Sequence, residues 1–162
     1  RDLRISQIYE GTNGVQSQDL IGRKTIKCGG AFIAEYIAEI RDFANALDTD
    51  LNFIKDATLG AATEIEAITQ FIIEQAAENV DFPNAAAVDY LHAVGLLSFA
   101  YMFAKIAAAA KDKSGDFYQN KLALAQYFVD RILPELDSRL AKIKAGSDLI
   151  MNFSEDYFTN QA

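Results

Sequence analysis

The sequence has little of several residue types on which many folds and sites depend. Its 162 residues contain one cysteine, one histidine, two prolines, nine glycines and no tryptophan. A single cysteine, Cys28, excludes an intrachain disulfide and a zinc cluster built from cysteines, and we expect it to be a buried, unreactive thiol. One histidine is too few for a histidine zinc motif or for a catalytic triad beside a G-x-S-x-G elbow, which is also missing. The scarcity of proline and glycine leaves little room for a loop-rich β protein.

Positive charge is also in deficit. Lysine and arginine number 15 against 23 aspartates and glutamates, so the formal net charge is −8. Binding to a phosphate backbone needs clustered lysine and arginine, and the deficit therefore argues against nucleic-acid binding and against adhesion to an anionic membrane. Hydrophobic residues make up 51% and charged residues 23%, as in a folded globular chain. The length suffices for one sizeable core.

What the sequence does have is helical periodicity. Apolar residues recur at steps of three and four in runs over about 15–23, 32–47, 51–79, 85–113 and 117–133, and again from residue 134 onward. The third run has a near-heptad seam, formed by Ile54, Thr58, Ala61, Ile65, Ile68, Ile72 and Ala76. No stretch alternates with period two for the length of a strand. We predict an all-α protein: an up-and-down helical bundle of four long helices or more, preceded by a short, loosely attached helix-loop-helix leader.

The run over 85–113 is apolar on nearly all sides. Its uncharged part, between His92 and Lys105, is shorter than the ~20 residues of a bilayer crossing, so we expect no membrane span. We predict a central buried helix instead. His92 has no acidic or cysteine partner at ligand spacing, and its expected role is structural.

Carboxylates on the 51–79 run recur every fourth residue. Glu66, Gln70, Glu74 and Glu78 form this row, which could be mistaken for a metal-binding site. A di-iron bundle needs a histidine three residues after such glutamates, and none is there. We therefore interpret the row as a solvated face and predict no metal site.

The C-terminal third continues the same pattern. The inward face of the 117–133 run is predicted to consist of Tyr118, Leu122, Ala125, Val129 and Ile132. That of the last run is predicted to consist of Leu136, Leu140, Ile143, Ile150 and Met151. The polar tail from residue 152 to 162 is expected to dock on the bundle or to fray.

The opening segment has a different character. Residues 8–14, Ile-Tyr-Glu-Gly-Thr-Asn-Gly, are typical of a helix end, a short loop and a new helix start. Gly11 and Gly14 permit a positive φ or a close approach of the backbone to a ligand. Glu10 lies at the helix end beside large apolar residues, where desolvation would raise its pKa toward that of a useful general base. An ordinary surface glutamate at a helix stop is the commoner explanation of such a pattern.

A longer stretch of sequence is more specific. Arg1-Asp2, the run from Ile8 to Gln16 and the run from Asp19 to Lys24 together closely resemble the acyl-CoA dehydrogenase family. From about Lys24 onward the chain resembles the additional helical domain of a long-form, mainly bacterial branch that includes 3-methylmercaptopropionyl-CoA dehydrogenase-like enzymes. The resemblance implies two domains: residues 1–23, the end of the C-terminal helical domain with the catalytic-base loop, and residues 24–162, the additional bundle. Because the chain begins with Arg1 and not Met, we expect a C-terminal fragment.

The resemblance also implies roles for the opening residues. Glu10 would be the base that removes the α-proton of an acyl-CoA thioester, while the β-hydrogen leaves as hydride to the flavin. Tyr9 would line the acyl pocket, and Gly11 would lie next to the substrate. Thr12, Asn13 and Gly14 would lie along FAD. Many family members carry a longer polar residue where Gly14 stands, so a side-chain contact is missing there.

For the full-length protein the resemblance implies an FAD-dependent, cytoplasmic oxidoreductase of fatty acid metabolism. It would use an acyl-CoA substrate and an electron-transfer acceptor, and it would be a homo-oligomer. The fragment alone is expected to bind no FAD and to be inactive, because the family's middle β-domain and N-terminal helical domain are not in this chain. One alternative is a non-catalytic helical interaction or oligomerisation module. Another is a relative whose flavin performs oxygen-dependent or nitro-compound oxidation, against which Glu10 weighs because such relatives often replace the base.

Overall fold

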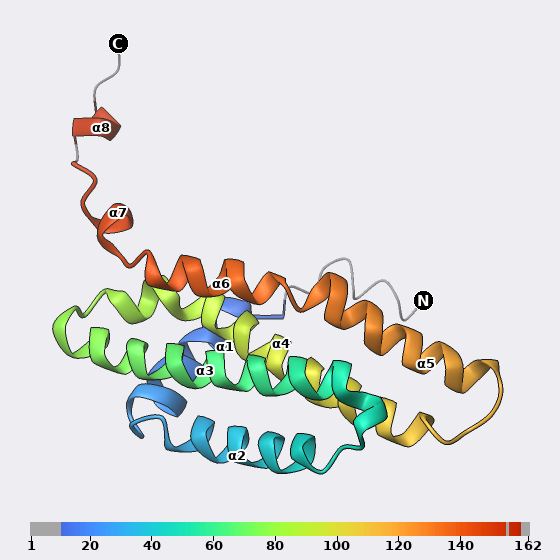
Figure 1. The fold of residues 1–162 in the computed structure, drawn as a ribbon. Coiled ribbons are helices and arrows are strands. Elements are labelled where there is room, and N and C mark those ends of the chain that lie inside the picture. The colour runs from blue at the N-terminus through green and yellow to red at the C-terminus, as the bar shows by residue number, and fades with distance from the viewer. Residues whose placement is uncertain (1–10, 155, 160–162) are drawn as a thin grey trace.

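The computed structural model describes residues 11–154 and 156–159, and these residues form helices and connecting turns without a strand (Figure 1). The all-α prediction is confirmed. In chain order the elements are α1 (Asn13–Gln18), the π-helix η2 (Asp19–Ile26), α2 (Ala31–Asn45), the 3₁₀ turn η3 (Thr49–Leu51), α3 (Asn52–Glu78), α4 (Phe82–Ala110), α5 (Asp116–Tyr127), the π-helix η4 (Phe128–Ile132), α6 (Glu135–Lys144), α7 (Asp148–Met151) and α8 (Asp156–Thr159).

The long helices form the predicted up-and-down bundle. α2, α3 and α4 run antiparallel in succession, and α5 with α6 returns along α4 (Figure 1). α4 is the central helix, since α1, α2, α3, α5 and α6 all pack against it. Short connections between the helices favour this arrangement, because consecutive helices then lie side by side.

The core confirms the heptad seam of α3. Its members from Ile54 to Ile72 are buried, and they face a row of small residues on α4 that includes Ala93, Ala100 and Ala104. Small side chains on one helix and branched side chains on the other allow close packing at native density. Each fully buried isoleucine stabilises the fold by about 1.5–3 kcal/mol relative to an exposed one.

The opening helical segment is not loosely attached, so that part of the prediction is wrong. α1 and η2 form helical structure from residue 13 to residue 26, and both pack against α4. Ser17, Ile21 and Thr25 are buried, and Ile21 belongs to the main core cluster. The i→i+5 hydrogen bonds of a π-helix widen its turn, so residues four apart stay near one face. The domain division after residue 23 stays a prediction.

A tight turn joins η2 to α2. Gly29 and Gly30 adopt φ values of 60° and 80°, which glycine tolerates without a Cβ penalty. Cys28, predicted to be buried, is only half-buried, and its Sγ donates to the Lys24 carbonyl oxygen at 3.1 Å. The reason is its place in this turn, outside the helices that form the core.

α4 is the central helix that the sequence predicted, and one sector of its surface is exposed. Leu96, Leu97 and Tyr101 are buried as expected, but Phe99 and Met102 are 58% and 42% exposed. Among the described residues α4 is the one helix long and apolar enough to cross a membrane by length and composition, and 44% of its most apolar window is buried. This is weak evidence for a span, because the core helix of a bundle has the same composition.

The last helices differ from the predicted pattern in register. Phe128, which was not predicted to face inward, is buried and stacks on Phe103 with ring centroids 4.7 Å apart. It is the first residue of η4 and lies three residues after the buried Ala125, so both are near the same helix face. Ala125 is buried as predicted, and Pro134 precedes the first residue of α6.

The inward positions predicted for Ile150 and Met151 are wrong. Leu136, Leu140 and Ile143 are buried, but α6 ends at Lys144, and Gly146 (φ 76°) turns the chain. α7 and α8 then extend away from the bundle (Figure 1), with Ile150 60% and Met151 56% exposed. A helical face continues only as far as the helix does.

Candidate functional site

The structure describes four of the six residues of the predicted site. Tyr9 and Glu10 lie outside the described residues, so their predicted roles stay predictions. Gly11, Thr12, Asn13 and Gly14 are described, and they form the turn that leads into α1.

This turn contains two consecutive residues in the left-handed region. Gly11 has φ 77°, and Thr12 has φ 51° and ψ 37°. Glycine adopts such values freely, but for a β-branched residue they cost roughly 1–2 kcal/mol. The Thr12 hydroxyl donates to the Gly11 carbonyl at 2.7 Å, and the Thr12 carbonyl accepts from the Gln16 amide at 3.0 Å. Residues held in sparsely populated conformations cluster at functional sites, which makes this turn a candidate.

The side of the turn that faces away from the bundle is polar and open. Thr12, Asn13 and Gly14 are exposed. A Cβ built on Gly14 would meet nothing within 4 Å, so packing among the described residues does not explain a glycine there. The side chains of Thr12 and Asn13 and the backbone of Gly14 therefore lie on the outer surface of the bundle.

The opposite side of the turn is anchored in the bundle. Ser17 is almost fully buried, and its Oγ donates to the Gly14 carbonyl at 2.8 Å. One turn of helix later Ile21 enters the core. The exposed residues 12–14 are thus attached to a rigid support, which is a requirement of a preorganised site.

A cluster of three buried hydroxyl groups extends this support to the other helices. Tyr90 on α4 is fully buried, and its hydroxyl lies 2.8 Å from Thr69 Oγ1 on α3 and 3.5 Å from Thr25 Oγ1 on η2. Thr69 donates to the Ile65 carbonyl at 2.6 Å, and Thr25 donates to the Leu20 carbonyl at 2.9 Å. Burial raises the pKa of Tyr90 above its ordinary value. The cluster ties η2, and with it the candidate turn, to the centre of the bundle.

Sequence reasoning missed this cluster. The available signal was Thr69, a hydroxyl residue beside the isoleucine seam of α3. A buried hydroxyl needs a hydrogen-bond partner, so its presence there indicates a second polar group from another helix.

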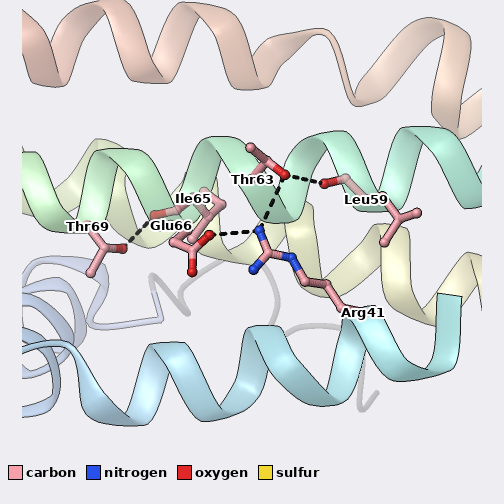
Figure 2. Close-up of polar contacts among 6 residues, drawn as sticks. All are labelled: Arg41, Leu59, Thr63, Ile65, Glu66 and Thr69. Atoms are coloured by element: carbon pink, nitrogen blue, oxygen red, sulfur yellow. Dashed lines mark hydrogen bonds and ion pairs between the residues drawn. The ribbon is translucent and has the colours of Figure 1, made fainter. Parts of the chain in front are cut away.

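The predicted solvated face of α3 is confirmed. Gln70, Glu74 and Glu78 are exposed, while Glu66 is partly exposed and accepts from Arg41 Nη2 of α2 at 2.7 Å (Figure 2). The same nitrogen lies 3.4 Å from Thr63 Oγ1. The Arg41 guanidinium lowers the pKa of Glu66. In the described part of the chain no cluster of three or more histidine, cysteine, aspartate or glutamate residues could hold a metal ion.

Comparison with known proteins identifies a family and several relatives of this chain. Residues 36–154 match the family model described as acetyl-CoA dehydrogenase C-terminal like. The chain is 28% identical to a broad-specificity linear acyl-CoA dehydrogenase of Mycobacterium tuberculosis, covering 98% of this chain and 28% of the relative. It is 29% identical to the 3-methylmercaptopropionyl-CoA dehydrogenase of Ruegeria pomeroyi, over 95% of this chain and 28% of the relative. It is also 26% identical to a butyryl-CoA dehydrogenase of Syntrophomonas wolfei, over 98% of this chain and 28% of the relative.

The chain thus spans little more than a quarter of the length of these relatives. The family model covers most of the chain, from α2 to the end of α7, and the similarity to the relatives also includes the opening turn. The family that the opening motif suggested is therefore found along nearly the whole chain, and the protein belongs to the acetyl-CoA dehydrogenase C-terminal-like family of acyl-CoA dehydrogenases.

Proposed function

We propose that this chain is the C-terminal part of an FAD-dependent acyl-CoA dehydrogenase and that it contributes the catalytic base, Glu10. The observation that carries the proposal is the left-handed turn at Gly11 and Thr12, which directly follows Glu10 and is anchored in the core through Ser17. The names of the relatives support the reaction class.

The exposed turn has the chemistry to contact FAD. Thr12 and Asn13 offer a hydroxyl and an amide, both of which can donate and accept hydrogen bonds. Gly14 has no side chain, and the space where a Cβ would stand is open. When bound, FAD supplies the acceptor for the hydride that leaves the β-carbon.

The chain's own part of the reaction is proton transfer. Glu10 takes the α-proton of the thioester, and the electron pair of that C–H bond forms the new α,β double bond as the hydride departs. A base for such a weak acid needs a pKa raised toward neutral, about 6–7, which burial beneath a bound substrate provides. The Glu10 amide donates to the thioester oxygen and stabilises the negative charge that develops there. Gly11 leaves room for the thioester, and Tyr9 lines the acyl pocket.

The proposal extends to the partners of the intact protein. These are an acyl-CoA substrate and an electron-transfer acceptor, in a cytoplasmic homo-oligomer. The 162-residue chain alone is proposed to be inactive, since a flavin needs more enclosing surface than one exposed turn.

The test is a Glu10→Gln substitution in the intact protein. Gln keeps the size of the side chain and removes the base, so α-proton exchange of an acyl-CoA with deuterated water should fall by about 10²–10⁴-fold. FAD content should be unchanged, because only the carboxylate is altered. Glu74→Gln, on the solvated face of α3, is the matched control and should exchange at the wild-type rate. Unchanged exchange in the Glu10 variant would refute the proposed role.

A non-catalytic helical interaction module is the second candidate. The observation that favours it is the exposed apolar face of α4. If Glu10→Gln leaves proton exchange intact, this function stands in its place.

A further inference from the structure

The exposed turn contains a pair of residues with a reactivity that the proposed function does not use. The chain has eight asparagines, and Asn13 is the one that a glycine follows. Both Asn13 and Gly14 are exposed, and a Cβ built on Gly14 would meet nothing within 4 Å. Solvent therefore reaches this pair from the outer side of the turn.

An asparagine followed by glycine can modify itself. Hydroxide removes the proton from the Gly14 nitrogen, which attacks Cγ of Asn13 and closes a five-membered succinimide ring. The side-chain nitrogen takes a proton from water and leaves as ammonia. Water then opens the ring at one of its two carbonyl carbons, which leaves either an aspartyl or an isoaspartyl residue at position 13. A Cβ on the second residue of the pair would obstruct the attack, so glycine allows it most readily.

The start of α1 allows the backbone motion that ring closure needs. The peptide between Asn13 and Gly14 must rotate out of its helical orientation. This rotation breaks the 3.0 Å hydrogen bond from the Gln16 amide to the Thr12 carbonyl, which spans the pair. α1 has six residues and no acidic residue in its first turn. Short helices are marginal by themselves, and carboxylates near an N-terminus stabilise it, so this turn opens more readily than the long helices do.

We propose that Asn13 is a site of spontaneous deamidation, at a rate set by the opening of the first turn of α1. Ser17 is buried and Ile21 lies in the core, so the opening stops before these residues and leaves the bundle folded. Asn84 offers a comparison within the same chain. It is exposed near the start of α4, but it is followed by Ala85, whose Cβ obstructs the attack.

The modification alters the turn that is proposed to contact FAD, and this step rests on the proposed function. Both products replace a neutral amide with a carboxylate and remove the hydrogen-bond donor of the Asn13 side chain. The isoaspartyl product also lengthens the main chain by one carbon atom. FAD bound against the turn would exclude solvent and stabilise the closed form of α1. Loss of the flavin therefore exposes Asn13 to a slow, irreversible change that weakens rebinding.

Peptide mass spectrometry of the 162-residue chain, kept in warm and mildly alkaline buffer, tests the reaction. The tryptic peptide over residues 5–23 should gain about 1 Da, because a hydroxyl replaces an amino group, and fragmentation should place the gain at Asn13. The gain should be faster at higher pH, since hydroxide removes the proton from the Gly14 nitrogen. At Asn84 the reaction should be slower, on the order of tenfold.

Two glycine variants form a matched pair. Gly14→Ala adds a Cβ at the reacting position and should slow the gain at Asn13, on the order of tenfold. Gly22→Ala adds a Cβ that also meets no atom within 4 Å, but away from Asn13, and should leave the rate unchanged. Equal helical content by circular dichroism shows that both variants fold.

Three results would overturn the proposal. The first is an Asn13 that keeps its mass in the folded chain. The second is an equal rate at Asn13 and at Asn84. The third is an equal rate at Asn13 in Gly14→Ala and in wild type.

The intact protein tests the protection by FAD. Samples with FAD and with the flavin removed are incubated alike, and the mass of the same peptide is followed. The flavin-free sample should gain mass several-fold faster, and it should then rebind less FAD in proportion to its modified fraction. Equal rates in the two samples would show that the flavin does not cover the turn. None of these readouts involves Glu10, so the deamidation and the proposed catalytic role succeed or fail separately.

Discussion

Replacing Thr69 with valine removes one hydroxyl from the buried cluster that joins η2 to α3 and α4, with little change in side-chain volume. Thr69 is 3% exposed, and the Tyr90 hydroxyl lies 2.8 Å from its oxygen. In the variant Tyr90 keeps only the contact of 3.5 Å with Thr25, whose own proton goes to the Leu20 carbonyl. A buried hydroxyl left without a good partner costs about 1–3 kcal/mol, so we expect Thr69→Val to destabilise the fold by that amount.

Replacing Tyr90 with phenylalanine removes the other partner and should cost less. Thr69 still donates to the Ile65 carbonyl, and Thr25 still donates to the Leu20 carbonyl. No buried donor is then left unpaired, so the loss is that of one net hydrogen bond, about 0.5–1.5 kcal/mol. The double variant has no unpaired hydroxyl. Its loss of stability should therefore be smaller than the sum of the losses in the two single variants.

Urea denaturation followed by circular dichroism measures the free energy of unfolding of the three variants and the wild type. Thr63→Val is the control, because Thr63 is an exposed threonine of the same helix whose hydroxyl also donates to a backbone carbonyl four residues earlier. It should change stability by less than about 0.5 kcal/mol. A larger loss of stability in Tyr90→Phe than in Thr69→Val, or additive losses in the double variant, would contradict this assignment of hydrogen bonds.

Three other predictions follow from the described contacts. Gly30→Ala should destabilise the fold by about 1 kcal/mol or more in urea denaturation, because φ is 80° and the new Cβ would lie 3.1 Å from Ile73. Gly22→Ala is the control and should not destabilise the fold, because its new Cβ would meet no atom within 4 Å. NMR titration should find the pKa of Glu66 below its ordinary value and rising in Arg41→Gln. At pH values above the ordinary glutamate pKa, the ion pair stabilises the fold by no more than about 1 kcal/mol. This stabilisation is lost as the pH falls through the lowered pKa of Glu66 in the folded state. The purified 162-residue chain should show no flavin absorbance; a flavin band would contradict the expectation that it binds no FAD.

The sequence predicted the helices whose apolar residues form one stripe. In α3 the seam from Ile54 to Ile72 is buried as expected, because a single apolar face leaves one way to pack the helix. α4 is apolar on nearly all sides, so its sequence alone does not distinguish the buried Leu97 from the exposed Phe99. That difference is decided by where the neighbouring helices lie.

Other predictions failed where the helical period leaves a choice of residue or where the contact is distant in sequence. Phe128 lies three residues after the buried Ala125 and shares its face, whereas the predicted inward face took Val129, four residues after Ala125. At the candidate site the motif indicated a positive φ for Gly11 but not for Thr12, since a β-branched residue disfavours it. The contact between Thr25 and Tyr90 joins residues 65 apart in sequence, and no local pattern contains that information.

The most direct test of the proposed catalytic role is the rate of flavin reduction in the intact protein, measured by anaerobic stopped-flow mixing with an acyl-CoA. The account predicts that wild type loses its flavin absorbance rapidly, and that Glu10→Gln, loaded with the same amount of FAD, does so about 10²–10⁴-fold more slowly. Flavin reduction at the same rate in both proteins would contradict it.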